Sequence, residues 1–422
     1  MRRVLIDAAV ILPPLAALGA VSARACLANA GIGHGALAIL AAAIVYLAVC
    51  VVLRRRQGLL LRLALLGWSS LLTLSAGMAA LSAINRRGRT AQRPAGRYDP
   101  DRRAAEEPLM AADAYKGQAW VRDYYREFHR GRRSEWHSYV YWRRIPFAGK
   151  YINVDERGIR RTWNASDSRA NPTRIFMFGG SAMWGLGVRD DHTIASAVSR
   201  ELARRGHRVH VTNFAEDGYV STQSLISLIL RLRSGDVPDV VVFYSGVNDV
   251  LAALEGRRAG IPYNEFNRRR EFARMTEQPY RPTDPQIDDE ELIRQVVDLY
   301  LGNVHVLAAL ANQFDFQAFC YWQPVGFVGK PLTKYEQQSM PGLDLPGEAG
   351  HRSRFFRDAY AHMETRPLPK HVRNISRTFE ADASPYYLDF CHLSERGNAV
   401  VARVIVEDIA RSLSRPASRP SS

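Results

Sequence analysis

One short segment, residues 174–185, constrains the fold of this chain more than any other. Residues 174–178 are mostly apolar, and Gly179, Gly180 and Ser181 follow them. A short apolar run bounded by glycines is typical of a buried strand that ends in a tight turn. A serine just beyond a parallel strand lies at the carboxyl edge of a sheet, where α/β folds bind ligands. An ordinary strand-to-helix turn with an incidental serine is the alternative. Phosphate binding is less favoured, because neither G-x-G-x-x-G nor a Walker lysine is present.

Downstream of this segment, strand patterns and helical patterns alternate. Apolar runs of strand length occur at 174–178, 209–213, 240–244 and 316–322, and a fifth strand is expected to end at 386–388. Helical periodicity begins near residue 193 and recurs at 222–232, 293–308 and 394–413. Residues 252–290 and 330–369 show no such period and are expected to be irregular insertions. This alternation predicts an α/β fold, a three-layer α/β/α arrangement around a five-stranded parallel sheet.

Polar residues follow four of these five strands. They are Ser181 after the first strand, Gly218 after the second, Asn248 after the third, and Asp389 with His392 after the fifth. Because the carboxyl ends of parallel strands meet at one edge of a sheet, these residues are expected to share a cleft. Acyl transfer needs such a set: a hydroxyl nucleophile, a base, a carboxylate that orients the base, and donors for the oxyanion.

The order and spacing of these residues resemble the four blocks of the SGNH (GDSL-type) hydrolase superfamily. Its serine block corresponds to residues 178–181, its glycine block to 213–218, its G-x-N-D block to 246–249 and its D-x-x-H block to 389–392. The resemblance covers roughly residues 172–413. The chain departs from the motif at Gly180, where the family has aspartate. That aspartate is not the acid of the triad, so the departure concerns the subfamily more than the chemistry.

The resemblance implies a role for each residue. Ser181 would be the nucleophile, His392 its general base, and Asp389 the carboxylate that fixes the imidazole tautomer. The backbone amides of Ser181 and Gly218 and the side-chain amide of Asn248 would form the oxyanion hole. The resemblance implies no cofactor and no metal ion.

Other interpretations of these residues remain open at the sequence level. Asn248 and Asp249 would also fit a turn followed by a helix cap, and the pair Asp389 and His392 would fit a surface pair near a helix start. His192 is a second candidate base, although it fits better at the start of the next helix. Asp249 is a second candidate acid, but the resemblance gives its position a role in supporting the asparagine loop.

The first 85 residues differ from the rest of the chain. Residues 36–53 and 63–84 are uncharged apolar runs long enough to cross a bilayer. Residues 4–21 are a weaker candidate because they contain Asp7, Pro13 and Pro14. We expect three transmembrane helices within residues 1–85, with a buried helical hairpin as the alternative.

Arginines near these runs bear on the orientation in the membrane. Those at positions 2, 3 and 54–56 would be cytoplasmic, which would place the body of the chain on the periplasmic side of a bacterial inner membrane. Four arginines between residues 86 and 93 favour a cytoplasmic body instead. We expect a multi-pass membrane protein with a periplasmic body.

Three segments flank or precede the hydrolase-like domain, which spans residues 171–413. Residues 86–113 are rich in Arg, Ala, Pro and Glu and are expected to be a linker. Residues 114–170 carry many aromatic side chains among arginines. Such rings stack on sugars or bases, but more commonly they pack on a main domain, so we expect an extension packed on the catalytic domain. Residues 414–422 are expected to be a disordered tail.

The composition excludes some classes of function. The formal net charge is +15, but only five of the 57 basic residues are lysine, and an arginine bias can reflect coding composition. No RNA-binding motif or zinc-finger spacing is present, so we expect no nucleic-acid partner. Four cysteines are too few for a disulfide scaffold, and no pair has metal-ligand spacing. A single bridge between Cys320 and Cys391 remains open.

The sequence therefore predicts a membrane-anchored serine esterase or deacylase. It would act through an acyl-enzyme on an ester, with O-acetyl as one candidate, of an envelope carbohydrate or glycolipid. An O-acyltransferase that passes the acyl group to a sugar hydroxyl at the same site is the first alternative. A non-catalytic carbohydrate- or lipid-binding module is the second, and the complete set of site residues argues against it. The sequence specifies neither the natural ester nor any protein partner.

Overall fold

The computed structural model describes residues 107–165, 171–263, 265–276, 287–340 and 342–414. The chain divides into two units, Met1–Tyr98 and Asp99–Ser422, and all described residues lie in the second. The three predicted transmembrane helices, most of the predicted linker and nearly all of the predicted tail lie outside the described residues. Within the described ranges, no helix combines the length and the apolar character that crossing a membrane requires.

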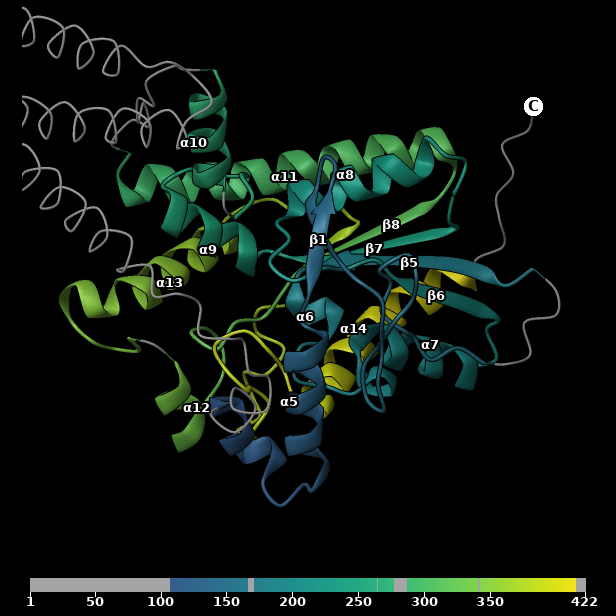
Figure 1. Ribbon diagram of the computed structural model, residues 1–422, viewed down its shortest axis with the longest axis horizontal. Coiled ribbons are helices and arrows are strands. Elements are labelled where there is room, and N and C mark those ends of the chain that lie inside the picture. The colour runs from purple at the N-terminus through teal and green to yellow at the C-terminus, as the bar shows by residue number, and fades with distance from the viewer. Residues whose placement is uncertain (1–106, 166–170, 264, 277–286, 341, 415–422) are drawn as a thin grey trace, which may run out of the picture. The chain divides into compact units, whose positions relative to one another are not determined.

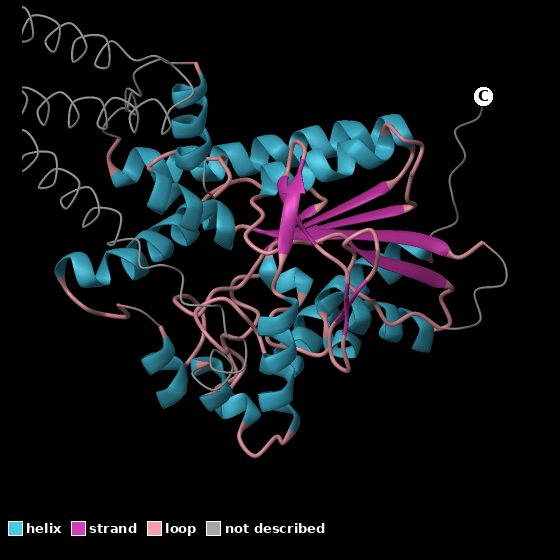
Figure 2. Ribbon diagram, in the orientation of Figure 1, coloured by secondary structure: helices cyan, strands magenta, loops and turns pink. Residues whose placement is uncertain are grey.

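Five parallel strands form the central sheet (Figures 1 and 2). They are β5 (Thr173–Gly179), β6 (Val209–Asn213), β7 (Val240–Ser245), β8 (Gln317–Trp322) and β9 (Val372–Asn374). Their order across the sheet is β6-β5-β7-β8-β9, so the chain starts inside the sheet, steps to one edge, and then crosses to the other side. This confirms the predicted α/β fold with a five-stranded parallel sheet. The order is flavodoxin-like, with a topological switch point between β5 and β7.

Helices cover both faces of the sheet. The main four are α7 (Ile194–Arg204), α8 (Ser221–Leu232), α11 (Asp289–Phe314) and α14 (Glu395–Leu413). Helices α7 and α14 pack together on one face, and α8 and α11 on the other (Figure 1). All six residues of β7 are buried, as expected for the central strand of a sheet that is covered on both sides.

The two segments predicted to be irregular contain helices. Helices α9 (Val247–Gly256) and α10 (Glu265–Met275) extend into the first, and α12 (Lys334–Ser339) and α13 (His351–Glu364) lie in the second. The prediction was wrong because charged residues interrupt the apolar pattern. In α13 the buried side chains Phe356, Tyr360 and Met363 do keep a helical spacing, which the charged residues between them obscure.

The prediction for the fifth strand was also wrong. The fifth strand of the sheet is β9, whose three residues are too few to give a periodic signal. The segment 386–388 lies outside the sheet, because a side chain satisfies its backbone. The N–H groups of Tyr386 and Tyr387 both donate to Oε1 of Glu336, at 2.9 Å each. A carboxylate from α12 thus replaces the neighbouring strand that these amides would otherwise need.

The aromatic-rich segment is built from one helix and two hairpins. These are α5 (Trp120–Gly131), the pair β1 (Ser134–His137) and β2 (Tyr141–Arg144), and the pair β3 (Phe147–Ala148) and β4 (Asn153–Val154). Tyr124, Tyr125 and Phe128 of α5 are buried in the same core as the sheet. Trp136 and Tyr139 of the first hairpin are instead 59% and 64% exposed.

Candidate active site

Ser181 is held at the carboxyl end of β5. The strand ends at Gly179, Gly180 is the cap of the short helix α6 (Ser181–Trp184), and Ser181 is its first residue. Strand β5 lies between β6 and β7, so Ser181 stands at the switch point of the sheet. Open α/β sheets form a ligand-binding crevice at this point. The Ser181 side chain is half-buried.

His392 and Asp389 meet Ser181 from the loop that precedes α14. Nε2 of His392 lies 2.7 Å from Oγ of Ser181, and Nδ1 of His392 lies 2.7 Å from Oδ2 of Asp389. The other carboxylate oxygen of Asp389 accepts the backbone N–H groups of Cys391 and His392, at 2.9 and 2.8 Å. Three residues that the sequence separates by up to 211 positions therefore form one continuous hydrogen-bonded chain.

The electrostatics of this chain suit a base next to a hydroxyl. Burial lowers the pKa of His392, but the charge and hydrogen bond of Asp389 together with the neighbouring Cys391 raise it by more in sum, and the net pKa lies well above the usual value. Burial raises the pKa of Asp389, while the charge of His392 and hydrogen bonds from the loop lower it, so this carboxyl remains ionised. An ionised Asp389 accepts a hydrogen bond from Nδ1–H, which leaves Nε2 of neutral His392 free to accept the Ser181 proton.

The loop that carries Asp389 and His392 is closed on itself. The N–H of Leu388 donates to the carbonyl of His392 at 2.8 Å, and the N–H of Ser394 donates to the carbonyl of Tyr386 at 2.7 Å. Helix α12 supports it from outside, because the Tyr335 hydroxyl donates to the carbonyl of Leu388 at 3.0 Å. The segment predicted to be an irregular insertion therefore positions the acid and the base.

Glu336 of α12 extends this support. Besides accepting the backbone N–H groups of Tyr386 and Tyr387, it forms an ion pair with Lys330 at 2.7 Å, and both side chains of the pair are fully buried. A buried ion pair with both partners hydrogen-bonded fixes geometry, since removing either partner leaves an uncompensated charge. Sequence reasoning missed Glu336, because its partners are backbone amides fifty residues away.

Asn248 lies beside the serine turn. Its side-chain Nδ2 donates to the carbonyl of Tyr219 at 2.9 Å. A β-carbon placed on Gly180 would overlap this same Nδ2 atom and would lie 3.3 Å from the Tyr219 carbonyl oxygen. Only glycine fits at position 180 while Asn248 keeps this place.

Asp249 supports the asparagine loop. Its Oδ1 accepts both the backbone N–H and the hydroxyl of Ser221, at 2.9 and 2.5 Å, and its Oδ2 accepts the N–H of Gly246 at 3.2 Å. These bonds tie the start of α9 to the start of α8. Asp249 is engaged there, whereas Asp389 is the carboxylate that contacts His392.

Gly218 lies in a loop that the first hairpin holds from outside. Its φ of +74° falls in the left-handed region, which glycine adopts without strain. Nε1 of Trp142 donates to the carbonyl of Asp217 at 2.8 Å, and Arg144 forms an ion pair with the Asp217 carboxylate. The N–H of Glu216 donates to the carbonyl of Gly179 at 3.2 Å, which joins this loop to the strand that precedes Ser181.

His192, the second candidate base, lies elsewhere. Its Nδ1 is 3.5 Å from the carboxylate of Glu395, and its backbone carbonyl accepts the side-chain amide of Asn398 at 3.2 Å. These contacts place it against the first turns of α14. His392 is therefore the histidine that contacts Ser181.

Arg160 is a second supporting residue that sequence reasoning missed. It is only 1% exposed, and its guanidinium pairs with Asp190 at 3.0 Å. It also donates to the carbonyls of Trp184, Gly185 and Val188, at 3.1, 2.6 and 2.7 Å. This one side chain closes the loop that follows the serine helix. No sequence motif marks it, because its partners are mostly backbone carbonyls.

Cys391 adds a potential metal ligand next to Asp389 and His392, and ligand atoms of the three residues lie within 4.8 Å of one another. The carboxylate and the imidazole already bind each other, and burial raises the pKa of the Cys391 thiol to about 11. A protonated thiol is a poor metal ligand. Hydrogen bonding between the three residues accounts for the cluster. Cys391 and Cys320 are both free and buried, so the open question of a bridge is answered in the negative.

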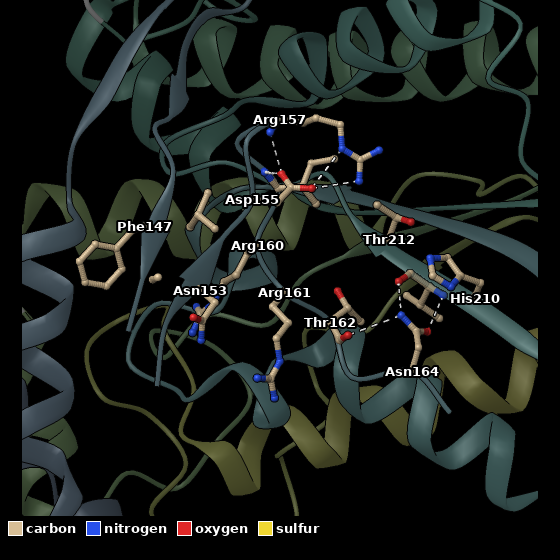
Figure 3. A pocket seen from close by; sticks show the side chains of 14 residues that line it. Phe147, Asn153, Asp155, Arg157, Arg160, Arg161, Thr162, Asn164, His210 and Thr212 are labelled. Atoms are coloured by element: carbon tan, nitrogen blue, oxygen red, sulfur yellow. Dashed lines mark hydrogen bonds and ion pairs between the residues drawn. The ribbon is translucent and has the colours of Figure 1, made fainter. Parts of the chain in front are cut away.

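A cavity of about 420 Å³ lies away from these residues, along the edge of β6 (Figure 3). It is lined mainly by residues 147–164 and 210–212. Three arginines line it, but Arg157 is paired with Asp155, Arg160 with Asp190, and Arg161 with Asp191. We assign it no ligand, because these carboxylates already neutralise its positive charge.

Searches with the sequence match no known family model and no curated protein. In structure the chain is similar to GDSL-type esterases and lipases over slightly more than half its length. An acetyl xylan esterase, AlAXEase, matches at 16% identity over 56% of this chain and 99% of its own, with a TM-score of 0.32. The esterase EstA from Pseudoalteromonas sp. matches at 12% identity over 58% and 100%, with a TM-score of 0.32.

A GDSL-like lipase from Bacteroides thetaiotaomicron VPI-5482 matches at 16% identity over 57% of this chain and 89% of its own, with a TM-score of 0.30. Identities and scores this low do not transfer an activity or a substrate.

Proposed function

We propose that this chain is a serine ester hydrolase of the SGNH type. The observation that carries the proposal is the hydrogen-bonded chain from Ser181 through His392 to Asp389, with both side-chain distances at 2.7 Å. A hydroxyl, an imidazole and a carboxylate in this order are the parts that nucleophilic acyl transfer requires. The order of the blocks in the sequence supports the same assignment.

The reaction begins with attack of Ser181 Oγ on the ester carbonyl carbon, while Nε2 of His392 takes the hydroxyl proton. Collapse of the tetrahedral intermediate breaks the bond to the alcohol oxygen, which receives the proton from His392. A water molecule then loses a proton to His392 and attacks the acyl-enzyme, and that proton returns to Ser181 as the acid leaves. Asp389 stays ionised throughout and stabilises the imidazolium.

The oxyanion of each intermediate needs donors on the side of Ser181 away from His392. We assign the backbone N–H of Ser181, which as the first residue of α6 has no partner within the helix, together with the N–H of Gly218 and Nδ2 of Asn248. Asn248 donates one of its two amide protons to Tyr219, which leaves the second for substrate. Three donors from three loops would then surround the reacting carbonyl.

Hydrolysis is the reaction that we favour over transfer to a second alcohol. Ser181 is half-buried and the His392 side chain retains 12% exposure, so water can reach the acyl-enzyme. Release of free acid without acylated sugar distinguishes hydrolysis from transfer.

We further propose that the enzyme is anchored in a bacterial inner membrane with its catalytic domain in the periplasm, and that it acts on an ester of an envelope carbohydrate or glycolipid. The long uncharged runs in the first 85 residues support the anchor, and the arginines at 54–56 support the orientation. A reporter active only in the periplasm should be active when fused after Arg93 and silent after Arg56. The reverse pattern would place the domain in the cytoplasm.

The chemistry is tested by hydrolysis of 4-nitrophenyl acetate by the full chain in detergent. Ser181→Ala should lower kcat/KM by roughly 10⁴-fold or more while the circular dichroism spectrum is unchanged. Ser224→Ala is the control, because it removes the hydroxyl of another serine in the same domain, one that is buried and has no hydrogen-bond partner among the described residues. Equal activity of Ser181→Ala and wild type would rule out the proposal.

A further inference from the structure

The hairpin β1–β2 carries aromatic rings that the fold leaves open to solvent. Trp136 is 59% exposed and stacks on Tyr141, with ring centroids 5.4 Å apart and planes 18° apart. Tyr141 has a φ of +75°, a left-handed conformation that is strained for a residue other than glycine. The fold thus holds this pair of rings in place at a cost to stability.

Further aromatic rings lie between this pair and the proposed oxyanion hole. Tyr141 lies next to Trp142, with ring centroids 6.4 Å apart. The ring edge of Trp142 is 3.5 Å from the position of a β-carbon on Gly218, and so is the ring edge of Tyr263. Gly218 is thus flanked by two aromatic rings. We call the set Trp136, Tyr141, Trp142 and Tyr263 the aromatic track; it leads from the site to the surface.

The edges of the aromatic track are polar. The Tyr141 hydroxyl donates to the Glu265 carboxylate at 2.5 Å, and the Arg268 guanidinium lies 5.6 Å from the Trp136 ring centroid. At the inner end, the hydroxyl oxygen of Tyr263 is buried and has no hydrogen-bond partner within the described part of the chain. A buried hydroxyl without a partner is costly unless a bound molecule completes its hydrogen bonding.

Flat rings bordered by donors and acceptors suit one class of ligand. A pyranose ring presents C–H groups on its faces and hydroxyls around its rim, so it stacks on an aromatic ring and hydrogen-bonds at its edge. An acyl chain has no hydroxyls, and it would leave the buried Tyr263 hydroxyl without a partner.

We propose that the aromatic track binds the sugar residues of the ester substrate, so that the substrate class of this enzyme is an O-acylated glycan. This inference rests on the proposed esterase function and adds to it the residues that bind the sugar part of the substrate. Trp136 and Tyr141 bind a sugar residue away from the scissile ester, and Trp142 and Tyr263 bind the sugar next to Gly218.

The test compares two kinds of ester with the full chain in detergent. One is 4-nitrophenyl acetate, which has no sugar, and the other is a set of O-acetylated oligosaccharides of hexose, N-acetylhexosamine and uronate. Wild type should show a higher kcat/KM on at least one glycan ester than on 4-nitrophenyl acetate. Trp136→Ala should raise KM for that glycan ester about 10-fold, the equivalent of the 1.4 kcal/mol that one stacked ring can contribute. Its KM for 4-nitrophenyl acetate should rise by less than its KM for the glycan ester.

Tyr139→Ala is the matched control. Tyr139 lies on the same hairpin at similar exposure, but its ring lies 5.9 Å from the Arg233 guanidinium and outside the aromatic track. This variant should retain wild-type KM on both esters. Tyr263→Phe removes only the buried hydroxyl and should lower kcat/KM on the glycan ester more than on 4-nitrophenyl acetate.

Two results would overturn the inference. One is a wild type that hydrolyses no glycan ester better than 4-nitrophenyl acetate, and the other is a Trp136→Ala variant with wild-type KM on the preferred glycan ester. Both leave the esterase proposal standing. Failure of that proposal looks different: Ser181→Ala would hydrolyse either ester as fast as wild type.

Discussion

The side-chain amide nitrogen of Asn248 lies where a β-carbon on residue 180 would be, so it would overlap any side chain at Gly180. The glycine that precedes Ser181 is therefore a condition for the position of a proposed oxyanion donor, beyond its role in the turn. A residue with a β-carbon at 180 would require the Asn248 side chain to move.

The first prediction follows from this overlap. Gly180→Ala should displace Asn248 and lower kcat/KM for 4-nitrophenyl acetate by roughly 10²- to 10³-fold, the loss expected for one oxyanion donor. Gly302→Ala is the control, because nothing lies within 4 Å of a β-carbon at this position in α11. An unchanged rate in Gly180→Ala would show that Asn248 contributes nothing from its present place.

The second prediction concerns pH. The base must be neutral to accept a proton, and Asp389 holds the pKa of His392 well above 6.5. The rise of kcat/KM with pH should therefore have its midpoint above pH 6.5 in wild type. Asp389→Asn should lower the rate about 10⁴-fold and move the midpoint to lower pH, because the stabilising charge is gone. A midpoint that does not move would mean that another group controls the base.

The third prediction compares the loss of stability on replacing two neighbouring arginines, one buried and one exposed. Arg160 is buried, and Ala in its place would remove the cationic partner of Asp190, which would keep only the Asn153 amide among the described residues, and the guanidinium donors to three carbonyls. The loss in the free energy of unfolding should be about 3–5 kcal/mol. Arg161 is 54% exposed and pairs with Asp191, so Arg161→Ala should cost less than about 1 kcal/mol. Thermal unfolding of the two variants measures the difference, and equal losses would contradict the account of the serine loop.

The fourth prediction concerns Glu216, which is buried in the glycine loop. Burial raises its pKa to about 8, its Oε1 accepts the Arg144 N–H, and its Oε2 has no partner in the described ranges. The folded state therefore keeps this proton up to about pH 8, whereas the unfolded chain loses it near pH 4.5. Stability should fall with rising pH between these values.

Glu216→Gln removes that dependence. The melting temperature of the variant minus that of wild type should increase between pH 5 and pH 9. The increase should be about 2–4 °C for each kcal/mol of unfolding free energy that wild type loses over this range. A constant difference between the two proteins across this range would show that Glu216 does not titrate in the folded state.

Local patterns predicted the sheet and the site residues. The apolar run that becomes β7 is buried throughout, short blocks after two strands supplied Ser181 and Asn248, and the D-x-x-H block supplied His392 although no strand of the sheet precedes it directly. Such features depend on neighbouring residues in the sequence. The five-stranded parallel sheet was therefore predictable, and so was the short list of residues that the structure brings to one edge of it.

The supports of the site were not predictable. Glu336 and Arg160 act through backbone groups far along the chain, and neither belongs to a motif. Glu336 also explains the misplaced fifth strand, because it satisfies amides that the sequence pattern assigned to a strand. Long-range contacts between a side chain and the backbone leave no periodic signal, so only the structure shows them.

The most direct test of the central claim is labelling of Ser181 by a fluorophosphonate, read out by mass spectrometry of the full chain and its peptides. Only a serine activated by a neighbouring base reacts quickly with such a probe. The account predicts one adduct, on the peptide that contains Ser181, absent in Ser181→Ala and strongly reduced in His392→Ala. An adduct on another serine, or labelling that persists in Ser181→Ala, would contradict it.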